Sequence, residues 1–138
     1  MIEGISHMTF IVENLEKTKN MLEYLFSAEE VYSSDGKNFS ISNEKFFIIG
    51  NIWIALMENK KETLNKTYNH IAFKINKNDY DDYLKKIKQL NLEIKSSRSR
   101  VDGEGSSIYF YDYDHHLFEL HTGTLEERLN AYRTLDTL

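Results

Sequence analysis

A short phrase that occurs twice constrains the fold of this chain more than any other feature. Residues 6–12, Ser-His-Met-Thr-Phe-Ile-Val, return at 69–75 as Asn-His-Ile-Ala-Phe-Lys-Ile. In each copy apolar residues recur at every second position, which is the pattern of a strand that buries one face. A helix-like stretch follows each copy. Because two copies roughly 60 residues apart are too few and too widely spaced for a solenoid, we predict a duplicated unit forming a curved sheet.

The first unit is predicted to continue as a helix and several strands. Asn14 can cap a helix that carries Leu15, Leu22, Leu25 and Phe26 on one side. Strand-like segments are expected at 30–33, 38–42, 46–49 and 52–57, and the turn signals Asp35-Gly36 and Gly50-Asn51 separate some of them.

The second unit repeats this order. An amphipathic helix face is formed by Tyr80, Tyr83, Leu84, Ile87 and Leu90. Strands are expected at 93–95, 107–111 and 117–121, and Thr124 with Glu127 makes a capping box for a last helix. Each unit is thus strand, helix and about three strands, an α+β fold. Since the chain has no proline and no Gly/Ser linker, we expect one domain over 1–138, with modules at about 4–58 and 68–123 and a helix at about 125–135.

Two histidines and a glutamate on predicted strands form a candidate metal site. His7 and His70 occupy the same place in the two repeats, on the face opposite the apolar row, and Glu119 lies on the equivalent face of a late strand. The chain has no cysteine, so a metal would have to use histidine and carboxylate ligands. Two imidazoles and one carboxylate leave open positions on an octahedral ion, which suits a Lewis acid.

Composition excludes other classes of function. The net charge of −5 argues against a nucleic-acid partner, and no segment approaches the length of a membrane span. The N-terminus has neither the basic nor the apolar region of a signal peptide, so we expect a cytoplasmic protein without membrane or nucleic-acid partners.

Several motifs resemble a known family. The hairpin at 112–119 has the pattern Asp-x-Asp-x-His-x-x-Glu, which, with the paired units, is similar to the vicinal oxygen chelate (glyoxalase-like) superfamily. Gly-Ile-Ser-His-Met-Thr, Tyr-Asn-His-Ile-Ala-Phe and Glu-Leu-His-Thr-Gly-Thr-Leu-Glu-Glu-Arg-Leu resemble fosfomycin resistance proteins. Ser-Asn-Glu-Lys-Phe-Phe around Glu44 resembles the FosX type. The resemblance implies paired βαβββ modules in a curved, cleft-containing mixed sheet.

The resemblance also implies a reaction and a cofactor. It points to a Mn²⁺-dependent epoxide hydrolase that adds water to fosfomycin to give the diol and so confers antibiotic resistance. It implies a homodimer in which His7 of one subunit joins His70 and Glu119 of the other around the metal. Glu44 would be the general base that takes a proton from water, and Thr9 would hydrogen-bond the substrate.

The phosphonate group of such a substrate needs cationic and hydroxyl donors. The candidates are Arg98, Arg100, Ser106, Ser107, Tyr109 and Arg128. Tyr109 and Arg128 match the family pattern, whereas the choice between Arg98 and Arg100 stays open. Glu126 either positions Glu44 or lies on a solvated helix face.

The segments around these candidates are assigned structural roles. Gly103-Glu104-Gly105 resembles a potassium-binding loop of thiol-transferase relatives, but its residues differ, so no potassium is predicted. His116 and His121 are interpreted as structural.

Three alternatives remain open. A thiol transferase on the same scaffold would use glutathione, cysteine or bacillithiol. A non-catalytic drug-binding module would not need all three metal ligands. A dioxygenase or lyase is also compatible with the fold, because a fold does not fix a reaction.

Overall fold

The computed structural model describes residues 1–37, 40–61 and 64–137. The chain divides into two compact units, Met1–Asn65 (unit 1) and Lys66–Leu138 (unit 2), each with its own four-stranded sheet. Within the described residues, no helix is both long and apolar enough to cross a membrane.

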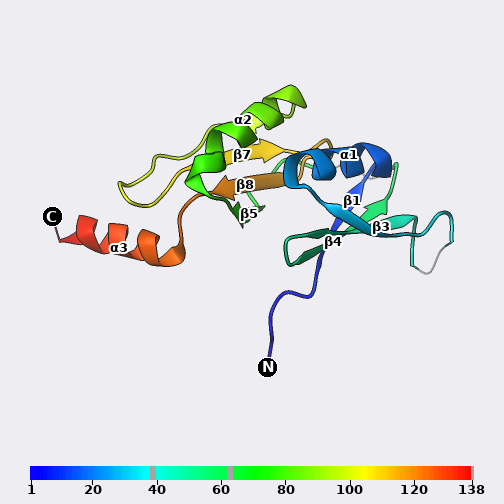
Figure 1. Cartoon of the computed structure of the whole chain (residues 1–138), viewed down its shortest axis with the longest axis horizontal. Coiled ribbons are helices and arrows are strands. Elements are labelled where there is room, and N and C mark those ends of the chain that lie inside the picture. The colour runs from blue at the N-terminus through cyan, green and yellow to red at the C-terminus, as the bar shows by residue number, and fades with distance from the viewer. Residues whose placement is uncertain (38–39, 62–63, 138) are drawn as a thin grey trace. The chain divides into compact units, whose positions relative to one another are not determined.

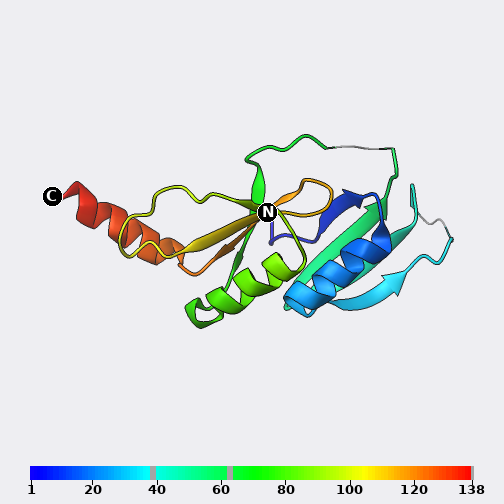
Figure 2. The ribbon, with the colours of Figure 1, turned by 90° about the horizontal axis from the view of Figure 1, so that it is seen from above.

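Unit 1 is a mixed sheet with one helix on it. Its elements are β1 (Met8–Val12), α1 (Leu15–Phe26), β2 (Glu29–Ser33), β3 (Glu44–Ile49) and β4 (Ile52–Glu58). The strand order is β1-β4-β3-β2, with β1 parallel to β4 and the other pairs antiparallel. Helix α1 lies along one face (Figure 2), where Met21, Leu22 and Leu25 are buried with Phe47 and Ile54.

Local sequence sets the ends of α1. The Asn14 side chain accepts a hydrogen bond from the backbone N–H of Lys17 at 3.0 Å, as the capping residue of a helix should. At the other end, Ser27 takes a left-handed conformation with φ 52°, and its N–H donates to the carbonyl of Glu23. The helix therefore begins where the sequence predicted and stops before β2.

Unit 2 repeats the topology. It comprises β5 (His70–Lys74), a 3₁₀ turn η1 (Lys77–Asp79), α2 (Tyr80–Gln89), β6 (Ile94–Lys95), β7 (Ser107–Tyr111), β8 (Leu117–His121) and α3 (Leu125–Asp136). The order is β5-β8-β7-β6, with β5 parallel to β8. Ile87 of α2 is fully buried, and α3 extends from the end of β8 away from the sheet (Figure 1).

Most of the predicted elements are confirmed. The α+β class with two βαβββ units is confirmed, as are the strands at 107–111 and 117–121 and the Thr124–Glu127 capping box. The strand at 38–42 is wrong over 40–42, which form bends, while 38–39 lie outside the described residues. The apolar alternation of 38–42 is short, and its segment finds no partner strand among the described residues. That the two units pack as one domain stays a prediction.

Candidate functional site

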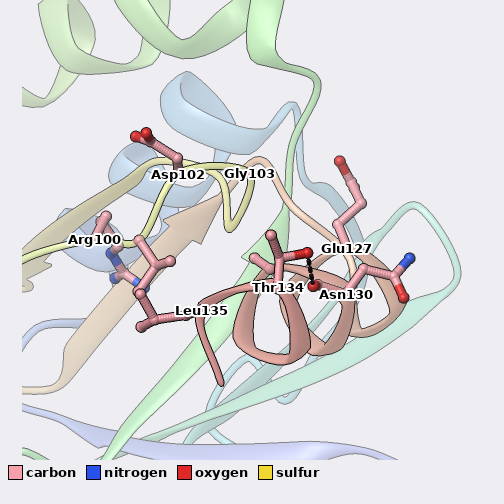
Figure 3. Close-up of a pocket in the computed structure, with 9 residues that line it drawn as sticks. Arg100, Asp102, Gly103, Glu127, Asn130, Thr134 and Leu135 are labelled. Carbon is pink, nitrogen blue, oxygen red and sulfur yellow. Dashed lines mark hydrogen bonds between the residues drawn. The ribbon is translucent and has the colours of Figure 1, made fainter. Parts of the chain in front are cut away.

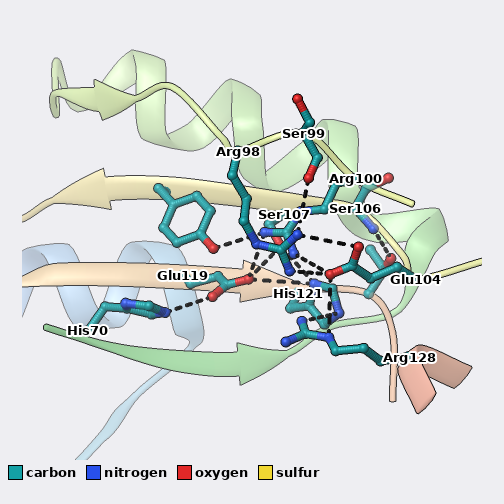
Figure 4. Close-up of polar contacts among 12 residues, drawn as sticks. His70, Arg98, Ser99, Arg100, Glu104, Ser106, Ser107, Glu119, His121 and Arg128 are labelled. Atoms are coloured by element: carbon teal, nitrogen blue, oxygen red, sulfur yellow. Dashed lines mark hydrogen bonds and ion pairs between the residues drawn. The ribbon is translucent and has the colours of Figure 1, made fainter. Parts of the chain in front are cut away.

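His70 and Glu119 come together because β5 and β8 are parallel neighbours. His70 opens β5 opposite Leu117, and Ala72, two residues on, lies opposite Glu119, so both side chains project from one face. The His70 Nε2 atom lies 3.0 Å from Glu119 Oε1 (Figure 4). The Glu119 side chain is 5% exposed, whereas that of His70 is 23% exposed, so the pair opens toward solvent on the histidine side.

The second nitrogen of His70 fixes how the ring can act. Its Nδ1 lies 2.6 Å from the backbone carbonyl of Tyr68, an acceptor that requires Nδ1 to carry the proton. Nε2 is then the ring nitrogen that faces Glu119 Oε1, 3.0 Å away. Such a backbone contact is how proteins orient a histidine that ligates a metal.

The Glu119 carboxylate is held ionised. Burial raises the pKa of Glu119, but hydrogen bonds from Ser107 and Tyr109 and the charge of Arg100 outweigh burial and place the pKa below its ordinary range. Ser107 Oγ donates to Glu119 Oε2 at 2.5 Å. A carboxylate and an imidazole nitrogen that face each other are a donor pair suited to a divalent cation.

His121 lies behind this pair. Its Nδ1 is 2.7 Å from Ser107 Oγ and 3.5 Å from Glu119 Oε2. Burial lowers the pKa of His121, and the charges of Arg128 and Arg100 lower it further. His121 therefore supports the carboxylate and Ser107 from within the sheet; its interpretation as a purely structural residue stays untested.

Arg100, in the loop that follows β6, reaches the same face as Glu119. Arg100 donates from Nη2 to Tyr109 Oη at 2.8 Å and to Glu119 Oε2 at 3.4 Å (Figure 4). Arg128 of α3 approaches from the other side, with Nη2 3.4 Å from His121 Nε2. Burial and the hydrogen bond between Tyr109 and Tyr68 raise the pKa of Tyr109 to about 12, so its phenol stays protonated and can donate.

A buried glutamate, Glu104, forms ion pairs with the arginines of this cluster. Glu104 is fully buried, and its carboxylate pairs with Arg98, Arg100 and Arg128. The hydrogen bonds from Arg98 lower the pKa of Glu104 to about 2 despite burial. The sequence predicted Glu104 only as part of a loop, although its place between two glycines could have indicated a residue at a tightly packed backbone.

The remaining predicted site residues lie in unit 1. Thr9 of β1 lies opposite Ala55 of β4. Two residues further along β4, Met57 lies between Ile11 of β1 and Glu44 of β3. Because side chains two residues apart on a strand share a face, Thr9 and Glu44 lie on the same face of the sheet. That face is opposite to the one that packs on α1. The backbone N–H of Glu44 donates to Ser34 Oγ at 3.0 Å, and its carbonyl accepts from the N–H of Ser34 at 3.0 Å. These two contacts hold the start of β3 in place.

His7 precedes β1 on that same face of unit 1. Its ring lies 4.2 Å from that of Trp53, and Ser6 Oγ lies 3.0 Å from Nδ1. Over residues 1–37, 40–61 and 64–137, no three His, Asp or Glu side chains are grouped closely enough to hold a metal ion. His7 belongs to unit 1, and the pair His70 and Glu119 belongs to unit 2.

Two hollows of unit 2 flank the arginine loop. One of about 730 Å³ lies between residues 100–103 and α3, with Arg100, Asn130 and Leu135 on its walls (Figure 3). The other, of about 680 Å³, is lined by Lys74, Lys77 and Arg100 among others. Neither is lined by His70 or Glu119, so the candidate metal pair lies outside both hollows. Glu126 is exposed on α3.

The chain matches known proteins over nearly its whole length. Residues 4–120 match the model of the Glyoxalase/Bleomycin resistance protein/Dioxygenase superfamily. The fosfomycin resistance protein FosX of Listeria innocua is 58% identical over 132 residues, which cover 96% of this chain and 98% of that protein. The metallothiol transferase FosB of Staphylococcus haemolyticus is 36% identical, with 96% and 93% covered.

A solved structure is similar in fold as well. A mutant FosX of Listeria monocytogenes, complexed with Mn(II) and 1S,2S-dihydroxypropylphosphonic acid, has a TM-score of 0.88 and 55% identity. The match covers 94% of this chain and 99% of that one. Because the identity to FosX exceeds that to FosB by a wide margin, the comparison separates the two types.

Proposed function

This chain belongs to the FosX fosfomycin resistance proteins of the Glyoxalase/Bleomycin resistance protein/Dioxygenase superfamily, and from that membership we propose that it hydrolyses fosfomycin to its diol. The ligand of the similar FosX structure, a dihydroxypropylphosphonic acid, is what water addition to the epoxide of fosfomycin would yield. The observation in this structure that carries the proposal is the contact of Arg100 with Glu119 at 3.4 Å. Arg100 is one of the cations proposed to bind the phosphonate, and Glu119 is a proposed metal ligand, so this contact joins the two parts of the proposed site.

The donor set fits Mn²⁺. Nε2 of His70 and the ionised carboxylate of Glu119 are adjacent, and His7 would complete the set as the third ligand. Bound there, the ion would supply Lewis acidity at the epoxide oxygen. The same metal is present in the FosX complex.

The chain's own residues would carry the remaining chemistry. Glu44 would take a proton from water as the water oxygen bonds to an epoxide carbon and the ring C–O bond breaks. The released oxygen gains a proton and becomes the second hydroxyl. Thr9, on the same face of unit 1 as Glu44, would hold the substrate.

The phosphonate would be bound by the polar cluster of unit 2. Arginine is suited to a phosphonate because its planar fork matches two oxygens at once. The proposed contacts come from Arg98, Arg100, Ser107, Tyr109 and Arg128. Arg98 and Arg100 converge on the same carboxylate of Glu104, so the choice between them is replaced by a proposal that both belong to the cluster.

The reaction is tested by following fosfomycin with phosphorus NMR. Purified protein with added Mn²⁺ and no thiol should convert fosfomycin to the diol, and Glu44→Gly should not. Glu29→Gln, which alters an exposed strand glutamate of the same unit, is the matched control and should turn over normally. No turnover by the wild type under these conditions would refute the hydrolase.

A thiol transferase is the second candidate because FosB is 36% identical over 96% of the chain. The same assay with glutathione, cysteine or bacillithiol discriminates the two. A phosphorus signal that differs from that of the diol and requires thiol would identify a transferase.

We further propose a cytoplasmic homodimer with ligands shared between subunits. Large apolar side chains of α3, Leu125 and Leu129, are 72% and 39% exposed, which favours a partner. His7→Ala and His70→Ala should each be inactive. Their mixed dimers should regain activity, because one of the two sites then has every ligand. If all ligands came from one chain, mixing would restore nothing.

A further inference from the structure

Glu104 has no part in the reaction as proposed, yet its carboxylate has polar contacts with four other side chains, Arg98, Arg100, Arg128 and Tyr132. Its Oε1 accepts from Arg100 Nη1 at 3.2 Å and from Tyr132 Oη at 3.1 Å, and it lies 3.5 Å from Arg128 Nε. Arg98 pairs with both carboxylate oxygens. A fully buried carboxylate with that many hydrogen-bond donors has its position and orientation fixed by the surrounding side chains.

The backbone around Glu104 is fixed against the end of β8. A Cβ added to Gly123 would lie 2.3 Å from the carbonyl oxygen of Glu104, and one added to Gly105 would lie 2.8 Å from the backbone N of Gly123. Ser106 and Thr122 are joined by hydrogen bonds of 2.9 and 3.0 Å. Only glycines permit this approach, so Glu104 is held in register with the strand that carries Glu119.

Arg100 links Glu104 to the candidate site. One guanidinium nitrogen, Nη1, binds Glu104, while Nη2 binds Tyr109 and Glu119. The side chain is 15% exposed, and its buried Nε has no hydrogen-bond acceptor among the described residues. The contact with Glu104 therefore orients the Arg100 guanidinium, and its Nε–H remains as a hydrogen-bond donor without an acceptor among the described residues.

Charge explains why such a residue is needed. Three guanidinium groups that converge on one face repel each other, and in a partly buried site this repulsion is weakly screened. Glu104 and Glu119 offset two of the three charges, which leaves one excess positive charge before a metal or substrate is bound. A phosphonate dianion would enter a site that is cationic but already assembled.

We propose that Glu104 is a positioning residue that assembles Arg98, Arg100 and Arg128 into a preorganised site for the phosphonate of the substrate. Its role rests on the proposed function. It touches neither metal nor reacting atoms and acts through the arginines.

The test is the Glu104→Gln variant, which keeps the shape and removes the charge. For fosfomycin turnover we expect KM to rise about 10- to 100-fold while kcat stays within about threefold, because ground-state and transition-state binding of the phosphonate are lost equally. The limbs of the pH–rate profile should not move, since Glu104 does not titrate near neutrality. Glu93→Gln removes an equal charge from an exposed position of unit 2 and should leave KM unchanged.

A binding measurement separates this proposal from the proposed function. Calorimetry with propylphosphonate, which has no epoxide, should show an affinity loss of about 10- to 100-fold in Glu104→Gln. This result is expected even if the wild type fails to hydrolyse fosfomycin. Unchanged affinity for propylphosphonate, or a fall in kcat with KM unchanged, would overturn the positioning role.

A milder variant covers the case in which Glu104→Gln does not fold. Tyr132→Phe removes one hydrogen bond to Glu104 from a side chain that is 37% exposed. We expect a rise of about threefold in KM with kcat unchanged. Equal KM values for Tyr132→Phe and the wild type would contradict the proposal.

Discussion

In both sheets the first strand runs parallel to the last, so the cross-strand partners of the two units can be compared position by position. Thr9 lies opposite Ala55 in unit 1 in the way that Ala72 lies opposite Glu119 in unit 2. Ala55 is thus the equivalent of Glu119. One unit offers a histidine and a methyl group where the other offers a histidine and a carboxylate.

The neighbouring strands differ in the same way. Glu44 pairs with Met57, and at the equivalent place Ser107 pairs with His121. The face that packs on a helix is mainly apolar in both units, while the opposite face differs between them. Unit 2 therefore holds the arginines and a histidine–carboxylate pair, whereas unit 1 has a histidine and has the carboxylate of Glu44 where unit 2 has a hydroxyl.

The largest effect is expected when unit 2 is made to resemble unit 1. Glu119→Ala gives β8 the side chain found at Ala55. Loss of one of the three proposed metal ligands should remove several kcal/mol of transition-state stabilisation, which lowers kcat/KM by more than about a thousandfold. Mn²⁺ binding, measured by electron paramagnetic resonance, should weaken in parallel. Retention of both would show that Glu119 is not a ligand.

The next effect tests what unit 1 adds. Glu44→Ser gives β3 the side chain that unit 2 has at Ser107. A general base contributes about 10²- to 10⁴-fold, so kcat should fall within that range. Mn²⁺ affinity should stay at the wild-type value, because Glu44 is not among the ligands. A variant that loses Mn²⁺ as well would place Glu44 at the metal and break the division between the units.

Acid should affect unit 2 through Glu104. The pKa of Glu104 is about 2 in the folded chain against 4.5 ordinarily, so the folded state binds fewer protons than the unfolded state between these values. Its contribution to stability is present above about pH 4.5 and is lost as the pH falls toward 2. Thermal melting from pH 6 to pH 3 should show a steeper decline in the wild type than in Glu104→Gln. Parallel curves would mean that the ion pairs do not stabilise unit 2.

The sequence was sufficient for the parts of this fold that depend on local patterns. Apolar alternation placed β7 and β8 at their observed bounds, and the capping residues Asn14 and Thr124 marked two helix starts. The strand predicted at 38–42 is absent over 40–42, because alternation over a few residues carries no information about a pairing partner.

The candidate site was less accessible from the sequence. His70 and Glu119 could be placed on corresponding faces, but their contact depends on the parallel register of β5 and β8, which no local pattern encodes. Glu104 acquires its partners from α3 and from the loop after β6. Arg98 and Arg100 are near Glu104 in the chain, but Arg128 belongs to α3, and that ion pair becomes visible only when the unit is folded.

The smallest effect concerns the charge network of unit 1, which lies on the face that packs on α1. Lys45 pairs with Glu30 at 2.9 Å and with Glu16 of α1 at 3.4 Å, and its side chain is 10% exposed. Hydrogen bonding to Lys45 lowers the pKa of Glu30. Partly exposed pairs of this kind contribute about 1 kcal/mol or less.

Lys45→Gln should therefore lower the free energy of unfolding in urea by about 1 kcal/mol and leave the turnover of fosfomycin unchanged. Lys45 is adjacent to Glu44 in sequence but projects from the opposite face of β3, because successive side chains of a strand alternate. A loss of turnover without a loss of stability would mean that the charge of Lys45 affects the groups on the opposite face of the sheet. The two faces of unit 1 would then not be independent, and the assignment of chemistry to one face alone would have to be abandoned.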